Sequence, residues 1–289
     1  MIEFHADDYG FFYNQSKRII KAIDEGIIDS ISVVVTGDNL RKCARLLGDR
    51  KVKTCLHINL IEGKGVARGG RDILVNEDGT FRLSFARLLM ISYNPFARKR
   101  YKRRLKSEIY RQICLFMRYY GKTLCIDSHV HFHMIPVVFD ALVEVIKEHD
   151  IKVDYIRIPK EKISLLEIKN FKLIDLVKII VLNILCTRNE FKYSAFLRGI
   201  NKMNFFCVMR RKNMNPDVVE KKLQGVDDCE VLFHPGGCYE KGDLEQITLR
   251  ADKAFFSSIN RKVELKLTKE LKKRMDNMKL NTMRDVRGI

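Results

Sequence analysis

The sequence predicts an α/β fold built on a parallel sheet or (β/α) barrel. Short β-branched segments alternate with longer helical patterns, which is typical of βα units. Six of the seven histidines fall at or near the expected C-terminal ends of strands, where parallel α/β folds build their sites. With 289 residues and 46% hydrophobic content, the chain can bury a substantial core, so we expect a single domain over residues 1–289.

The first half of the chain supplies four of the expected strands. They cover residues 2–5, 31–36, 52–60 and 123–128, with helices between them at 15–25, after Asp38, and in a basic segment that ends near residue 120. Gly26, Gly48 and Gly121 each follow one of these helices, as glycine commonly does at a helix C-terminus. Residues 63–80 are rich in Gly, Asp, Asn and Arg, which predicts a long loop of the kind that often carries binding residues.

The second half continues the alternation. Pro136 opens a helix that is expected to end near residue 150, and Pro is well suited to a first helical position. Further strands are predicted at 153–158, 205–209 and 229–234, with a helix at 216–223 and a polar helical segment after Gly242. The amphipathic pattern at 165–186 fits a core helix better than an interfacial one, because most such helices bury their apolar stripe.

The formal net charge of +18 is the most unusual feature of the composition. Its densest stretch runs from Arg98 to Arg104, just before apolar residues at helical spacing, so a solvated helix face is the first interpretation. Contact with a membrane surface or another polyanion is the alternative. No zinc-finger spacing, ribonucleoprotein signature or heptad zipper is present, and we expect no nucleic-acid partner.

The sequence offers no apolar window long enough to cross a bilayer and no leader-like N-terminus, since charged residues appear almost at once. The eight cysteines are scattered without a C-x-x-C pair, which favours reduced thiols. We therefore expect a cytoplasmic protein that could associate peripherally with a membrane.

Asp7 and Asp8 lie where the first strand runs into a loop at Gly10. Two adjacent carboxylates need a counter-charge, because otherwise one of them would take up a proton. A divalent cation would supply that charge. The alternative for an isolated Asp-Asp pair is an Asx turn before the next helix.

Histidines complete the candidate site. His129, His131 and His133 alternate with period two, so an extended strand would place all three rings on one face. His57 lies in an apolar segment, where a single histidine is often a hydrogen-bonded core residue. Together with the aspartates, however, these side chains form a thiolate-free donor set that suits zinc, or magnesium with additional waters.

Four segments also carry a family resemblance. In order along the chain they are 5–10 (HADDYG), 56–60 (LHINL), 127–136 (DSHVHFHMIP) and 233–236 (FHPG). This set resembles the YdjC-like carbohydrate deacetylases, which include the chitooligosaccharide deacetylases, and segments 155–159 (YIRIP) and 283–286 (MRDV) extend it over nearly the whole chain. Each motif alone is weak, whereas four in order are strong. Two positions depart from the family pattern, with His5 in place of the usual Asn and Val130 in place of a polar residue.

The resemblance implies a role for each candidate residue. Asp8, His57 and His129 would bind a divalent metal, either Mg²⁺ or Zn²⁺. Asp7 would be the general base and His234 the general acid. The side chains expected near the sugar are His131, His133 and Arg157. The fold implied is a distorted (β/α) barrel like those of polysaccharide deacetylases and glycoside hydrolases.

The activity implied is removal of an N-acetyl group from an amino sugar or oligosaccharide. The residues alone leave two alternatives, another metal-dependent hydrolase such as an amidohydrolase or phosphoesterase, and a basic non-catalytic protein that binds a membrane or polyanion. We expect an N-acetylated saccharide as substrate, with a lipid-linked or anionic acceptor and a homodimer as further expectations. Specificity would reside in residues 63–80 and 186–205.

Overall fold

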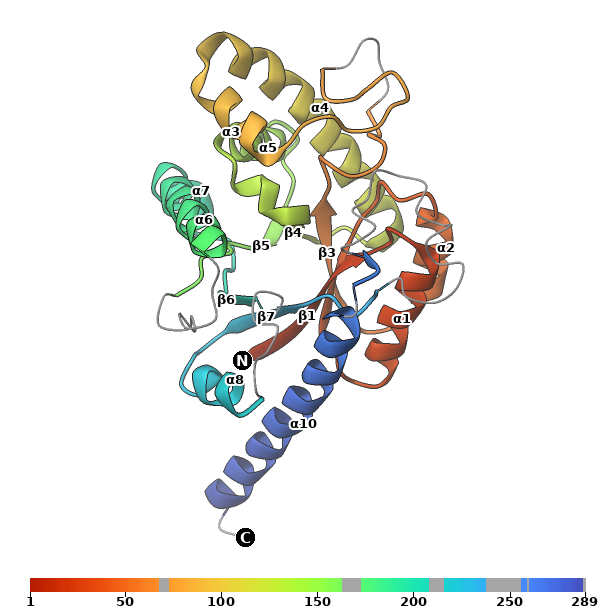
Figure 1. The fold of residues 1–289 in the computed structure, drawn as a ribbon, viewed down its shortest axis with the longest axis vertical. Coiled ribbons are helices and arrows are strands. Elements are labelled where there is room, and N and C mark those ends of the chain that lie inside the picture. Colours follow the sequence, from red (N-terminus) through yellow and green to blue (C-terminus); the bar gives the residue numbers. More distant parts are fainter. Residues whose placement is uncertain (68–72, 163–172, 208–215, 238–255, 259, 288–289) are drawn as a thin grey trace.

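The computed structural model describes residues 1–67, 73–162, 173–207, 216–237, 256–258 and 260–287 (Figure 1). Seven parallel strands form one sheet in the order β5-β4-β3-β2-β1-β7-β6. Their bounds are Ile2–Tyr9 (β1), Ser30–Val33 (β2), Lys53–Ile58 (β3), Leu124–Ser128 (β4), Val153–Ile156 (β5), Asn204–Cys207 (β6) and Cys229–Phe233 (β7). Each predicted strand is present, and β1 is longer than expected.

The sheet curls so that its two edge strands approach each other. Tyr155 of β5 donates a hydrogen bond from its hydroxyl to Glu230 of β7, although β4, β3, β2 and β1 all lie between these two strands in the sheet order. Isolated parallel bridges join Tyr155 to Asn201 and Glu161 to Phe205 along the seam between β5 and β6. The predicted barrel-like α/β fold is therefore confirmed, with an incompletely paired seam between β5 and β6.

Helices surround this sheet. They are Tyr13–Asp24 (α1), Leu40–Leu47 (α2), Phe85–Tyr93 (α3), Pro95–Tyr120 (α4), Pro136–Glu148 (α5), Leu173–Lys192 (α6), Ser194–Leu197 (α7), Pro216–Leu223 (α8) and Asn260–Arg287 (α10). The main core lies between the sheet and helices such as α4 and α5, whose buried faces include Ile109, Ile113, Val138 and Leu142. A second cluster packs α8 and α10 against β1 and β7.

Several helix predictions agree closely with the structure, and one feature differs. Pro136 opens α5, and Gly48 and Gly121 follow α2 and α4 as expected. The helix expected after Asp38 is α2, and its cap position is Asn39. Helix α3 was not predicted, and Ser84 caps it by accepting a hydrogen bond from the backbone N–H of Arg87.

Helix α6 buries one stripe and exposes another. Ile179, Leu182, Leu185 and Cys186 pack into the fold, so the expected core helix is present within 173–192. The opposite side exposes Leu173, Val177, Ile180, Ile184 and Phe191. Within the described ranges, no helix combines the length and apolarity needed to cross a membrane. Residues 163–172, which include the start of the predicted amphipathic segment at 165–186, lie outside the described part of the chain.

Two antiparallel bridges, Lys64 to Thr80 and Val75 to Phe81, lie within or next to the predicted loop at 63–80. Residues 68–72 of this loop lie outside the described part of the chain.

The turn at the end of β1 requires a glycine. Gly10 has a φ of 99°, and a Cβ atom there would lie 2.7 Å from the carbonyl oxygen of Val34. Only glycine fits this close approach without strain, and it fixes the turn that follows Asp7 and Asp8.

Candidate metal centre

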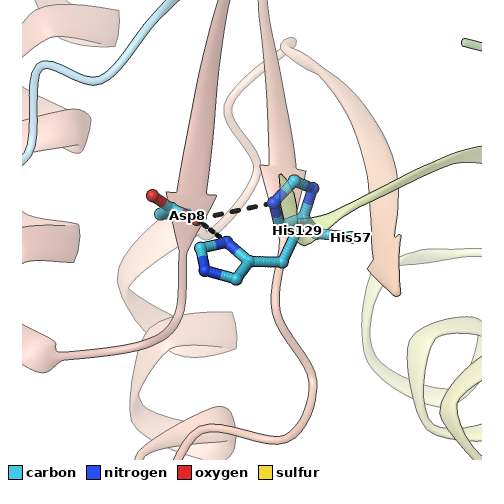
Figure 2. A group of neighbouring side chains, drawn as sticks. All are labelled: Asp8, His57 and His129. Atoms are coloured by element: carbon cyan, nitrogen blue, oxygen red, sulfur yellow. Dashed lines mark hydrogen bonds and ion pairs between the residues drawn. The ribbon is translucent and has the colours of Figure 1, made fainter. Parts of the chain in front are cut away.

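Asp8, His57 and His129 meet at the C-terminal ends of β1, β3 and β4 (Figure 2). His129 Nδ1 lies 2.9 Å from Asp8 Oδ1, and His57 Nε2 lies 3.4 Å from the same oxygen. All three side chains are buried, and one donor atom from each lies within 4.8 Å of the other two. The sheet therefore assembles the three predicted metal ligands from well-separated segments of the chain.

Two atoms of this cluster test whether a cation fits. Asp8 Oδ2 and His57 Nε2 are buried and have no hydrogen-bond partner among the described residues. Buried polar atoms are normally paired, so such atoms need an explanation. Burial opposes ionisation of Asp8, but His129 and His57 hold its pKa well below the ordinary range. An ionised carboxylate and two imidazoles fit a divalent cation.

Asp127 orients His57 from behind. His57 Nδ1 lies 2.7 Å from Asp127 Oδ1, which leaves Nε2 directed toward Asp8. A carboxylate behind a histidine ligand fixes the ring and its tautomer at metal sites. Burial lowers the pKa of His57, but Asp7 and Asp127 raise it to about 10. A metal would therefore displace a proton from this ring.

The counter-charge of Asp7 is Arg157 of the segment after β5. Arg157 Nη1 and Nη2 lie 3.1 and 2.9 Å from the two oxygens of Asp7. Burial opposes ionisation of Asp7, but Arg157 and His57 hold its pKa well below the ordinary range. From the sequence we expected a metal to neutralise both aspartates. The structure instead pairs Asp7 with an arginine and leaves Asp8 to the histidines.

Arg157 itself is fully buried and engages three carboxylates. Besides Asp7, its guanidinium lies 2.8 Å from Asp127 and 2.6 Å from Glu230. The expected contact of Arg157 with the sugar does not match this position, because its side chain has no exposed surface and its nitrogens face protein carboxylates. Arg157 therefore contacts Asp7 from the interior of the protein.

His5 extends this interior network. Its Nε2 lies 3.3 Å from Asp7 and 2.6 Å from the hydroxyl of Ser32, and its Nδ1 lies 2.6 Å from the hydroxyl of Ser30. Burial lowers the pKa of His5, but Glu230 and Asp7 are among the carboxylates that raise it to about 9. The sequence marks this residue only as a departure from the family pattern, and its partners on β2 could not be read from the sequence.

The prediction of three histidines on one face of an extended strand is wrong. Residues His129–Met134 form a 3₁₀ segment, η1, in which Val130 and His131 have left-handed φ angles of 51° and 57°. Successive side chains in this turn point in different directions, so only His129 joins Asp8 and His57. Left-handed backbone is costly for a β-branched residue such as Val130 and is found mostly at functional sites.

The other two histidines of this segment occupy different environments. His133 is fully buried, with Nδ1 2.5 Å from the Ser128 hydroxyl and Nε2 2.8 Å from the carbonyl oxygen of Arg157. Burial lowers its pKa to about 4, so the ring is neutral. His133 therefore links η1 to the segment after β5 through this hydrogen bond. The sugar contact expected for His133 does not match its burial. His131 lies against Phe205 in an edge-on ring contact.

His234 follows β7 and is held by the C-terminal helix. Glu264 of α10 accepts a hydrogen bond from the His234 backbone N–H at 2.8 Å and lies 3.5 Å from Nδ1. Arg261 pairs with the same glutamate at 2.9 Å. No motif in the sequence indicated Glu264 as the partner of His234.

Known proteins are similar to this chain in sequence or in fold. Residues 1–274 match the family model described as YdjC-like protein. A carbohydrate deacetylase of Mus musculus is 26% identical over 162 residues, which cover 54% of this chain and 50% of that protein. The chitooligosaccharide deacetylase of Serratia marcescens is 29% identical, covering 47% and 51%. Each of these two matches spans about half the length of the relative.

Two further similarities extend over most of the chain. A carbohydrate deacetylase of Clostridium beijerinckii is 22% identical over 233 residues, 80% of both chains. A crystal structure described as a cellobiose-phosphate cleavage protein of Enterococcus faecalis aligns with a TM-score of 0.64 and 15% identity, covering 96% of this chain and 94% of that one. At this identity the structural match concerns the fold.

Proposed function

Because the chain belongs to the YdjC-like family, we propose that it is a metal-dependent hydrolase that removes the N-acetyl group from an amino sugar or oligosaccharide. The single observation that supports this most strongly is the buried Asp8, His57 and His129 cluster beside the Arg157-paired carboxylate of Asp7. The relatives named as carbohydrate deacetylases supply the substrate class.

The proposed reaction divides the work among a few side chains. A divalent ion held by Asp8, His57 and His129 would polarise the amide carbonyl and activate a water. Asp7 accepts a proton as the water oxygen bonds to the carbonyl carbon. His234 donates a proton to the nitrogen as the C–N bond breaks, which releases acetate and a free amine. Arg157 keeps Asp7 ionised and fixes its orientation.

The donor set bears on the metal. Two imidazoles and one carboxylate without a thiolate suit zinc, which takes three protein ligands and leaves one position open in catalytic sites. Magnesium prefers oxygen ligands and keeps several waters. The proposal therefore favours zinc or a similar ion over magnesium.

An acetate-release assay tests the proposed function. Purified protein is supplied with zinc, magnesium, manganese or cobalt and offered a panel of N-acetylated saccharides. We expect release by the wild type, and Asp7→Asn should lower kcat by about 10²- to 10⁴-fold while metal content is unchanged, since Asn cannot take the proton. His234→Ala should fall in a similar range.

The matched control is Asp150→Asn. Asp150 is an exposed aspartate with a φ of 49°, a conformation that asparagine tolerates well, so this variant should retain full activity. A wild-type protein that binds metal but releases no acetate from any saccharide would contradict the proposal and direct the search to phosphate esters or other amides.

A further inference from the structure

Helix α4 carries two sets of cations, and only one of them is used within the fold. Arg98, Lys102 and Lys106 recur every four residues and therefore share one face. They pair with an equally spaced set on α5, Asp140, Glu144 and Glu148. This ladder explains part of the basic stretch as helix packing.

The second set lies on an exposed face of α4. Lys99 and Arg100 lie three and four residues after Phe96, and Arg103 lies three residues after Arg100. The four side chains therefore project from one side of the helix. Phe96 is 91% exposed, and the three cations are also exposed. None of these three forms an ion pair with any residue in the described part of the chain.

Apolar side chains extend this surface. Met90 and Tyr93, near the end of α3, are 67% and 70% exposed and lie shortly before Phe96 in the chain. We call Met90, Tyr93, Phe96, Lys99, Arg100 and Arg103 the α3–α4 face. Large exposed apolar side chains on α3 and α4, two helices that pack together, are unusual on a surface that meets only water.

Helix α5 links the start of α4 to the end of α6. Arg98 of α4 and Lys192 of α6 both bind Asp140. The residue before Lys192 is Phe191, which is 86% exposed and ends the exposed stripe of α6 described above. The α3–α4 face and the α6 stripe therefore lie on neighbouring elements.

Figure 1 shows where this surface lies relative to the candidate site. Helix α3 and the first turns of α4 extend beyond the C-terminal end of β3, the strand that contains His57. The metal cluster occupies the same end of the sheet. A surface that bound the α3–α4 face would thus lie at the end of the molecule that carries the site.

From these observations we infer that the α3–α4 face docks on an anionic lipid membrane. Cations attract acidic headgroups, and each Lys or Arg near the surface strengthens binding, while Phe96 and Met90 can enter the boundary of the acyl chains. A second copy of this chain is a poorer occupant, because it would place the same unpaired cations against each other. The inference concerns binding alone and does not depend on the proposed deacetylation.

Vesicle co-sedimentation of the full chain tests the electrostatic part. Phosphatidylcholine vesicles with phosphatidylglycerol should bind the protein, those without it should bind far less, and added salt should weaken binding. The triple variant Lys99→Gln, Arg100→Gln and Arg103→Gln should bind on the order of 100-fold more weakly. The matched control removes three exposed lysines from α1 and α10 (Lys21→Gln, Lys266→Gln and Lys273→Gln) and should bind like wild type.

The absence of tryptophan from the sequence gives a direct test of insertion. Phe96→Trp introduces a single fluorophore whose emission should shift to the blue on anionic vesicles, whereas Val263→Trp, on exposed α10, should not shift. The inference is overturned if the wild type ignores anionic vesicles, or if both triple variants lose binding equally. It is also overturned if the emission of the Phe96→Trp variant does not shift on anionic vesicles. Displacement of the protein from the vesicles by nucleic acid of equal charge would overturn it as well.

Discussion

Arg157 holds together the interior of the candidate site. It brings carboxylates from three different strands, Asp7, Asp127 and Glu230, onto one guanidinium. A planar fork with five donors can serve several carboxylates at once, whereas a lysine is a single point charge. Removing one partner from a buried ion network leaves uncompensated charge and costs about 3 to 5 kcal/mol. The position of Asp7, the proposed base, therefore depends on Arg157.

Arg157→Lys separates a positioning role from a sugar contact. If Arg157 acts through Asp7, kcat should fall by roughly 100-fold because a misplaced base loses reactivity, and KM should change little. A rise in KM with unchanged kcat would instead support the sugar contact that the sequence suggested. Lys160→Gln, an exposed neighbour, is the control and should leave both constants unchanged. Metal content of each variant checks that the fold is intact.

The candidate ligands could be predicted from the sequence, but the network behind them could not. Asp8, His57 and His129 each follow or end a recognisable strand, and strand ends meet at one edge of a parallel sheet. Glu264 and Glu230, by contrast, lie in an ordinary helix and an ordinary strand. Their importance depends on the curl of the sheet and the position of α10, which only three-dimensional contacts reveal.

Among the elements, α5 acts as the attachment point for two other helices. Asp140 near its start binds Arg98 of α4, Lys192 of α6 and the hydroxyl of Tyr193 just beyond α6. Burial raises the pKa of Asp140, but Tyr193, Lys192 and Arg98 together lower it below its ordinary value. Its charged form is therefore favoured in the folded protein.

Asp140→Asn should show this contribution as a function of pH. Because the folded-state pKa is lowered, the stabilisation is present above the unfolded value of about 3.9 and is lost as pH falls through the folded value. The variant should be less stable at pH 7 by about 1 to 3 kcal/mol, and the difference should shrink below about pH 4. Urea midpoints at both pH values measure it. An equal loss of stability at both pH values would contradict the contribution assigned to the charge of Asp140. Asp154→Asn is the control.

Element prediction succeeded where a local signal existed. Pro136 and Gly121 marked helix ends correctly, because proline and glycine act through backbone geometry. The segment after β4 carried a misleading signal, since alternating histidines suggested a strand and nothing predicted left-handed backbone at Val130 and His131. Valine is among the least suitable residues for that conformation, so tertiary contacts must impose it.

At the scale of the whole molecule, metal binding should stabilise the folded state. Asp8 Oδ2 and His57 Nε2, which lack a hydrogen bond in the described part of the chain, come together only when the sheet is assembled. An ion at about 100 times its Kd would stabilise the folded protein by about 2.7 kcal/mol, which corresponds to a Tm increase of roughly 5 °C. A chelator should reverse this increase in Tm. His57→Gln should abolish the increase, and His149→Gln, on the surface, should retain it; an unchanged wild-type Tm would contradict the site.

The network around Arg157 also bears on how this protein could have diverged from its relatives. Side chains on β1, β4, the segment after β5, and β7 share one enclosed group of charges, so a change at one position alters what the others can tolerate. His5 adds a ring that faces Ser30, Ser32 and Asp7. Substitutions at these positions are therefore expected to be inherited as sets, and grafting one of them alone into a relative should fail where grafting the set succeeds.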